Sequence, residues 1–265
     1  RNFDGTVVLI FQPAEEGGGG GREMVNDGML DRWNIQEVYG LHNSPGLPVG
    51  EFAIRSGSIM ASADEFEITV TGKGGHAAAP HDSIDPNVTA AHIILALQSI
   101  ASRNVDPLEA AVISVCALHS DIDTHNIIPQ MTRMTGTVRA LKDSIRSQVE
   151  ARIKKIVTST AEAYDCKAQV EYRLGYPVTI NHDAQTKYAA QAARTVAGNV
   201  DIDMPPIMAA EDFSFMLNKR PGAYIMLGNG DGALLHHPEY RFNDDAIPAG
   251  CSWYIEIVEQ RMPMQ

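Results

Sequence analysis

The chain has 265 residues and a formal net charge of −12, and 44% of its residues are hydrophobic. This length can supply the core of one large or two ordinary domains. Because a phosphate backbone needs a basic surface, the acidic balance argues against a nucleic-acid partner. No apolar run approaches the length of a membrane span, and the start is not a signal peptide. The three cysteines lie far apart, which favours free thiols in the reducing cytoplasm: Cys116, Cys166 and Cys251.

The first block of the sequence alternates strands and helices. An apolar run at 6–11 predicts a strand buried on both faces, and five consecutive glycines at 17–21 are interpreted as a flexible turn. A helix is expected over 22–30, and a second strand over 37–41, ending at His42. The chain lacks an initial Met and enters a buried strand at once, although such a strand needs neighbours. We therefore expect it to begin in the middle of a domain.

The second block has a different spacing of apolar residues. Near its start they occupy every other position, which is typical of a half-buried strand. Its predicted order, β-α-β-β-α-β, is that of the ferredoxin-like split motif. Asp143 is expected to cap the longer helix. The expected elements are a strand around 66–70, a helix over 86–103, strands over 111–118 and 134–141, a helix over 144–164 and a strand over 168–174.

The third block returns to the α/β pattern, with helices expected over 184–197 and 249–261 and a strand over 223–227. The predicted organisation is therefore an α/β domain interrupted by an inserted α+β domain of the ferredoxin-like kind. The expected boundaries are 1–62 and 175–265 for the α/β domain and 63–174 for the insertion.

Two adjacent carboxylates, Glu15 and Glu16, come directly after the first apolar run. Pro13 cannot donate to a strand ladder, so the strand is expected to stop there and leave both side chains on a loop. At this edge of an open α/β sheet, one carboxylate can hold a metal while the other faces an activated water. Taken alone, the pair is better explained as an acidic, solvated loop, and the metal site gains support only from the other residues described below.

Histidines complete a possible ligand set. His42 follows a predicted strand, and the pair His236–His237 follows a glycine-rich turn. Each has a structural explanation by itself, but one carboxylate and two imidazoles suit zinc or manganese. The sequence spacing does not establish that Glu16, His42 and His236 converge.

Seven segments together resemble one family, the co-catalytic metallopeptidases that include carboxypeptidase G, aminoacylase and hippurate hydrolase. The resemblance is to the amidohydrolase branch, which cleaves N-acyl amino acids and auxin–amino acid conjugates. The segments follow the family's order and span nearly the whole chain: FQPAEEG at 11–17, GLH at 40–42, GKGGHAAAPH at 72–81, NIIP at 126–129, GTVR at 136–139, AEDFS at 210–214, and LHHP at 235–238 with FND at 242–244.

The resemblance implies a zinc-peptidase-like catalytic domain and a role for each matching residue. Glu15 would be the general base, Glu16 and His236 ligands of one metal, and His42 a ligand of the other. His236 is preferred to His237 because the family places its ligand directly after the leucine. From the inserted domain, which forms the family's dimer interface, one histidine reaches the partner's active site. The matching residues there are His76 for the oxyanion, and Asn126 and Arg139 for the substrate.

The resemblance implies two divalent ions, which could be zinc, manganese, cobalt or nickel, and a homodimer that hydrolyses N-acyl amino acids. It also implies a histidine and a bridging cysteine upstream of Arg1, which the sequence lacks, so the chain is expected to be a fragment or a truncated form. Two alternatives remain: a dipeptidase or aminopeptidase of the same family, and a non-catalytic scaffold poor in metal.

Overall fold

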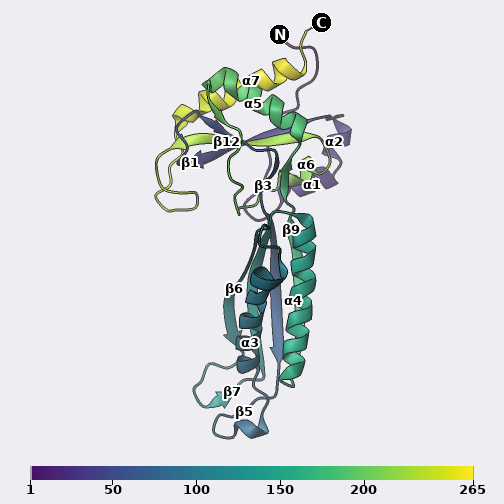
Figure 1. Cartoon of the computed structure of the whole chain (residues 1–265), viewed down its shortest axis with the longest axis vertical. Helices are drawn as coiled ribbons and strands as arrows, with labels where there is room; N and C mark the ends of the chain where they lie inside the picture. Colours follow the sequence, from purple (N-terminus) through teal and green to yellow (C-terminus); the bar gives the residue numbers. More distant parts are fainter. Residues whose placement is uncertain (1, 265) are drawn as a thin grey trace. The chain divides into compact units, whose positions relative to one another are not determined.

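The structure is a computed structural model that describes residues 2–264. Its contacts divide the chain into two compact units. The α/β unit consists of the residues up to Met60, Thr179–Ile207 and those from Glu211 onward, and the inserted unit consists of Ala61–Val178 and Met208–Ala210. Both are drawn in Figure 1.

The α/β unit is built on a four-stranded sheet in the order β1-β12-β2-β11. Its long strands, β1 and β12, are parallel, and the short β2 is antiparallel to β12. A separate pair, β3 and β10, is antiparallel. The strands of this unit are β1 (Val38–Pro45), β2 (Phe52–Ala53), β3 (Gly57–Met60), β10 (Thr179–Asn181), β11 (Val200–Asp201) and β12 (Gly222–Gly230).

Helices cover both faces of this sheet (Figure 1). The long helices α5 and α7 pack on one face, where Trp253 is fully buried, and the short α1, α2 and α6 pack on the other. The helices are α1 (Gly20–Asn26), α2 (Met29–Arg32), α5 (Asp183–Ala197), α6 (Ser214–Leu217) and α7 (Ile247–Arg261), with a 3-10 turn at Asp244–Ala246.

Strand β12 explains this layering. Its side chains alternate between the two cores, because successive residues of a strand point to opposite faces. Ile225 and Leu227 pack with α5 and α7, whereas Tyr224 and Met226 pack with the short helices. A strand buried on both faces needs a continuous apolar sequence, and the prediction of a strand over 223–227 is confirmed.

The prediction of a buried strand over 6–11 is wrong. The segment forms no ladder with any strand among the residues that the structure describes. Val8 and Ile10 pack against the core on one side. On the other side Leu9 and Phe11 are 76% and 84% exposed. The apolar run therefore buries one face only, because no described strand lies beside it.

Two further expectations in the first block need correction. The helix expected over 22–30 is two helices, α1 and α2, because Gly28 has a φ of 79° and ends the first. His42 lies inside β1, which continues to Pro45, and does not follow the strand. The remaining predicted strand, 37–41, is confirmed as the first half of β1.

The inserted unit has a four-stranded antiparallel sheet in the order β6-β8-β4-β9, with two long helices on one face (Figure 1). Phe66, Ile68 and Val70 point into its core, as their alternation predicts. Asp143 does not cap α4, because it is the first helical residue and Lys142 takes the cap position. The elements are β4 (Ser62–Thr71), β5 (Gly75–His76), α3 (Pro86–Ser99), β6 (Ala111–Ser120), β7 (Ile127–Ile128), β8 (Met131–Ala140), α4 (Asp143–Ala163) and β9 (Lys167–Tyr176), with a 3-10 turn at Pro80–Asp82 and a π-helical turn at Ile100–Asn104.

The described helices are all too short or too polar to cross a membrane. The three cysteines are free thiols, of which Cys166 is buried.

The carboxylate of Glu37 links β1, α5 and α7 of the α/β unit through hydrogen bonds. The guanidinium of Arg261, at the end of α7, donates two hydrogen bonds of 2.9 Å to Glu37, which lies just before β1. Tyr39 and Gln185 donate two more, and the Arg261 guanidinium lies 3.8 Å from the ring centre of Tyr188. Burial alone would raise the pKa of Glu37, but these hydrogen bonds together hold it below its usual value.

We expect Glu37→Gln to lower the free energy of unfolding by about 1–2 kcal/mol at pH 7, because the Glu37 side chain is only 24% exposed and its donors lose a charged acceptor. Since the pKa is depressed in the folded state, this stabilisation is present above the unfolded pKa, near 4.5, and is lost as pH falls through the folded pKa. Urea unfolding of both proteins at several pH values measures it. A difference that stayed constant down to pH 3 would contradict the assignment.

Candidate active site

A tight turn presents the Glu15–Glu16 pair. The amides of Gly18 and Gly19 both donate to the carbonyl of Ala14, at 2.8 and 3.0 Å, and close the turn just before α1. Ala14 has a φ of 54°, in the left-handed region that L-residues rarely adopt. The two carboxylates consequently point to different surroundings: Glu15 is half-buried and Glu16 is exposed.

Two further acidic residues lie against this turn and were given no role by the sequence analysis. Glu211 and Asp212 are both buried, immediately before α6. Carboxylate oxygens of Glu15, Glu211 and Asp212 lie within 4.8 Å of one another. The sequence signal was the AEDFS segment, in which adjacent carboxylates stand beside an apolar stretch; acidic residues buried in this way need a specific partner.

The surroundings of Glu15 raise the pKa of its carboxyl group well above the usual value for glutamate. Burial, together with the negative charges of Glu211, Asp212 and Glu16, raises the pKa of Glu15 to about 7. The backbone amide of Asp212 opposes the shift by donating to the carboxylate. A group with a pKa near neutrality can both accept and release a proton, which is what a general base requires.

Glu211 is held by two donors. The hydroxyl of Tyr224 donates to one oxygen at 2.6 Å, and the amide of Phe213 donates to the other at 3.0 Å. Burial raises the pKa of Glu211, although these hydrogen bonds oppose the shift. The ring of Tyr224 lies over Gly40 of β1, where a Cβ atom would come within 2.8 Å of it, so Gly40 provides the space that brings the tyrosine to Glu211.

His42 lies on the same face of the sheet as Tyr224, with the two ring centres 6.3 Å apart. Its Nδ1 lies 2.7 Å from the carbonyl of Asn43, and since a carbonyl only accepts, Nδ1 carries the proton. The lone pair of neutral His42 is therefore on Nε2. A donor bond of this kind to a carbonyl is how metal-binding histidines are usually oriented.

The structure brings Glu16 and His236 together from loops 220 positions apart in sequence. Oε2 of Glu16 lies 3.7 Å from Nε2 of His236, and both side chains are exposed. His236 has a φ of 65°, whereas the Nδ1 of its neighbour His237 accepts the amide of Glu239 at 3.1 Å. Of the two histidines, His236 is the one that faces Glu16.

These groups fit a divalent cation. Bonds of about 2.0–2.2 Å to a carboxylate oxygen and an imidazole nitrogen, at a tetrahedral angle, place the two ligand atoms about 3.5 Å apart. The distance of 3.7 Å between Glu16 and His236 matches this geometry. The repulsion among Glu15, Glu211 and Asp212 would be relieved by positive charge nearby.

The other three predicted site residues belong to the inserted unit. His76 is exposed at the end of β5, and its Nδ1 accepts the amide of Ala78 at 3.0 Å. Asn126 is exposed just before β7, where its carbonyl accepts the amide of Ala77 at 3.1 Å. Arg139 lies half-buried on β8 and donates to the carbonyl of Val138 at 3.0 Å.

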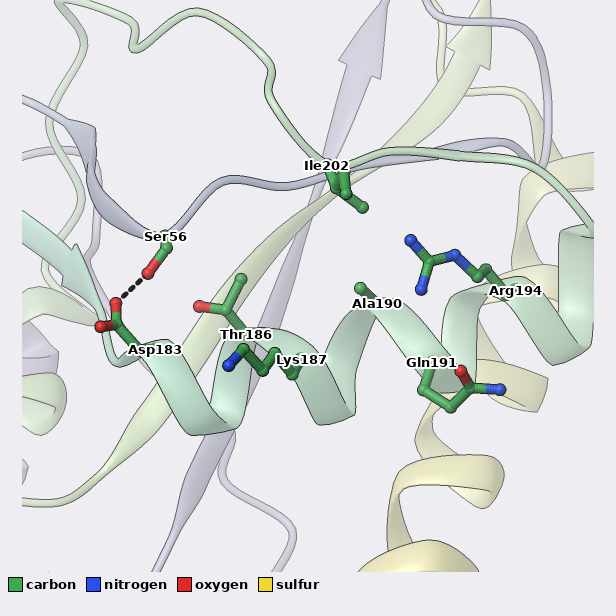
Figure 2. Close-up of a pocket in the computed structure, with 8 residues that line it drawn as sticks. All are labelled: Ser56, Asp183, Thr186, Lys187, Ala190, Gln191, Arg194 and Ile202. Carbon is green, nitrogen blue, oxygen red and sulfur yellow. Dashed lines mark hydrogen bonds between the residues drawn. The ribbon is translucent and has the colours of Figure 1, made fainter.

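One hollow along α5 is separate from this site. It has a volume of about 510 Å³, lies along α5 and contains none of the predicted residues (Figure 2). Its polar groups include Asp183, hydrogen-bonded to Ser56, and the cations Lys187 and Arg194. The hollow lacks the clustered carboxylates and imidazoles found beside β1 and the Glu15 turn.

A half-buried carboxylate with a raised pKa beside an exposed carboxylate–imidazole pair, on loops of an α/β unit, is an arrangement suited to a metal-dependent hydrolase. The family comparison agrees: residues 1–260 match the model of peptidase family M20/M25/M40, and the chain belongs to this family.

The curated relatives include several amide-cleaving enzymes. Hippurate hydrolase of Campylobacter jejuni is 38% identical over 259 residues, which cover 97% of this chain and 67% of the relative. N-acetyl-L-cysteine deacetylase of Bacillus subtilis is 38% identical over 93% of this chain and 58% of the relative. The chain therefore spans about two thirds, or less, of the length of these relatives.

Solved structures give the same picture. A dinuclear metal-binding peptidase of the M20 family from Bacillus subtilis superposes with a TM-score of 0.79 at 27% identity, covering 95% of this chain and 64% of that one. The resemblance inferred from the sequence motifs is confirmed.

Proposed function

We propose that the chain carries part of the active site of an amidohydrolase that uses a metal-activated water to cleave the amide bond of N-acyl amino acids, of the hippurate or N-acetyl type. The observation that carries the proposal is the division of labour between two adjacent carboxylates: Glu15 is half-buried with a pKa near 7, and Glu16 faces His236. The names of the 37–38% identical relatives support the substrate class.

Glu15 acts as the general base in this proposal. It accepts a proton from the water that attacks the acyl carbon, and it later delivers that proton to the amide nitrogen as the carbon–nitrogen bond breaks. The products are a carboxylic acid and a free amino acid. With an ordinary pKa, Glu15 would be a weaker base for the first step, and almost none of it would hold a proton for the second step near neutral pH.

Glu16 and His236 hold one divalent ion, and His42 presents Nε2 to a second. When bound, such ions polarise the acyl carbonyl and make water more acidic. Carboxylate and imidazole ligands suit zinc, manganese, cobalt or nickel. The M20 neighbour described as a dinuclear metal-binding peptidase supports the number of ions.

The inserted unit supplies the remaining roles. His76 stabilises the oxyanion in the active site of a second copy, which makes the enzyme a homodimer through this unit. Asn126 and Arg139 bind the substrate, and the guanidinium of Arg139 suits a free carboxylate. The free cysteines support a cytoplasmic location.

The alternative within the same family is a dipeptidase or aminopeptidase. The two differ in the amine side of the substrate: a peptidase needs a free amino group, whereas an amidohydrolase accepts an acyl cap. A scaffold without metal is the second alternative, and the Glu16–His236 arrangement disfavours it because two exposed side chains gain little by adopting ligand spacing without an ion.

The decisive test is hydrolysis of benzoyl- and acetyl-amino acids by the chain, with metal content measured by elemental mass spectrometry after dialysis. We expect bound divalent ions, turnover of the acylated substrates, and loss of turnover on addition of a chelator, with recovery when metal is restored. Faster cleavage of free dipeptides would favour the peptidase. A chain with neither metal nor turnover would contradict the proposal.

A further inference from the structure

Asp212 is fully buried and makes three hydrogen bonds to the turn that carries Glu15. One carboxylate oxygen accepts the amide of Gly21 at 2.6 Å, and the other accepts the side-chain amide of Gln12. Its own backbone amide donates to the carboxylate of Glu15. Gln12 and Gly21 are the two ends of the turn, so a single residue ties both ends and the catalytic side chain to the same place.

The glycine run permits this close approach. A Cβ atom on Gly21 would lie 2.9 Å from the Asp212 carboxylate, and one on Gly20 would lie 1.8 Å from the carbonyl of Pro13. Both glycines are buried. The interpretation of residues 17–21 as a flexible turn is therefore wrong for Gly20 and Gly21, which begin α1 and serve close packing.

We propose that Asp212 is the positioning residue of this active site: through Gln12 and Gly21 it fixes the turn that presents Glu15 and Glu16. The inference rests on the proposed function for its catalytic consequence. It concerns a residue whose two carboxylate oxygens are engaged by Gly21 and Gln12 and which acts through Glu15. Buried charged acceptors of two hydrogen bonds hold their donors strongly, because leaving those donors unpaired is costly.

The effect of losing this anchor follows from the geometry of catalysis. A general base works only within hydrogen-bond reach of the proton that it accepts, and a displacement of about 1 Å can cost roughly 100-fold in rate. Substrate affinity depends on other groups. Asp212→Ala should therefore lower kcat by roughly 10- to 100-fold and leave KM nearly unchanged.

The test compares four variants of the whole chain by amide hydrogen exchange and by kinetics. Asp212→Ala removes both acceptor oxygens. Gln12→Ala removes only the hydrogen bond between the Gln12 side chain and Asp212. Asp212→Asn keeps an acceptor for Gly21, and the side chain of Gln12 can turn to accept from the new amide. Glu37→Ala is the matched control, because it removes a multiply bonded carboxylate of the same unit away from the turn.

We expect Asp212→Ala to speed exchange of the Gly18, Gly19 and Gly21 amides by at least roughly tenfold while β12 keeps its protection. Gln12→Ala should increase the exchange rate of the turn amides by less. Asp212→Asn should keep most of the exchange protection and most of kcat. Glu37→Ala should lower the stability of the unit without changing the exchange of the turn or kcat. Unchanged exchange of the turn in Asp212→Ala, or an unchanged kcat in an active chain, would overturn the inference. If the parent chain neither binds metal nor hydrolyses substrate, the proposed function fails, and the exchange measurement still decides whether Asp212 positions the turn.

Discussion

Glu15→Gln is expected to reduce kcat by roughly 100- to 10,000-fold, the range that a positioned general base contributes. Glutamine keeps the size of the side chain and its ability to accept from the Asp212 amide, but it cannot take a proton from water. Metal content should stay unchanged, because the proposed ligands are Glu16, His42 and His236. Steady-state kinetics on an N-acyl amino acid and elemental mass spectrometry of the same preparation measure both quantities.

The neighbouring carboxylate provides the control. Glu16→Gln should lose metal as well as turnover, since its oxygen lies at ligand spacing from His236. The two variants change the same chemical group at adjacent positions, so a difference between them isolates the role of each. Loss of metal from Glu15→Gln would show that the assignments of base and ligand are reversed or shared.

Asp64→Ala is expected to destabilise the inserted unit by about 3–5 kcal/mol, the cost of breaking a buried ion pair from one side. Asp64 is fully buried and accepts two hydrogen bonds, of 2.8 and 2.5 Å, from Arg146 of α4, whose side chain is 12% exposed. It also accepts from Tyr172 and from the amide of Gly175 in β9. The substitution leaves the arginine buried without a counter-charge and removes the link between β4, α4 and β9.

A surface ion pair on the same strand supplies the comparison. Glu67 of β4, whose side chain is 16% exposed, pairs with Arg133, whose side chain is 56% exposed, and Glu67→Ala should cost much less than Asp64→Ala because water screens the arginine. Calorimetry of the whole chain, with the transition of the inserted unit followed separately, measures both. Equal losses for the two variants would contradict a special role for the buried carboxylate.

The sequence predicted best those elements whose burial is regular. The alternation of Phe66, Ile68 and Val70 and the long helix after Asp143 both appear where the pattern placed them, because one face of each packs on the same core. The apolar run at 6–11 misled the prediction for the converse reason. Hydrophobicity reports that a segment can be buried, and only the presence of neighbouring strands decides whether it is.

For the site, the sequence identified Glu15, Glu16, His42 and His236 as candidates but could not establish their convergence. The part that it missed consists of Asp212 and Glu211, whose carboxylates raise the pKa of Glu15, and Tyr224, which holds Glu211. No local pattern connects residues 12–21 with 211–224, because the contact depends on α1 and α6 packing on the same face of the sheet.

The sequence by itself determined the family, the pair of acidic residues after the first apolar run and the alternation that builds the inserted unit, since these are properties of residue types in order. Only the tertiary structure decided which histidine faces Glu16, why Gly21 is a glycine and which carboxylate anchors the turn. Those facts depend on distances between residues about 200 positions apart, and the folding of both cores, not local preference, brings such residues together.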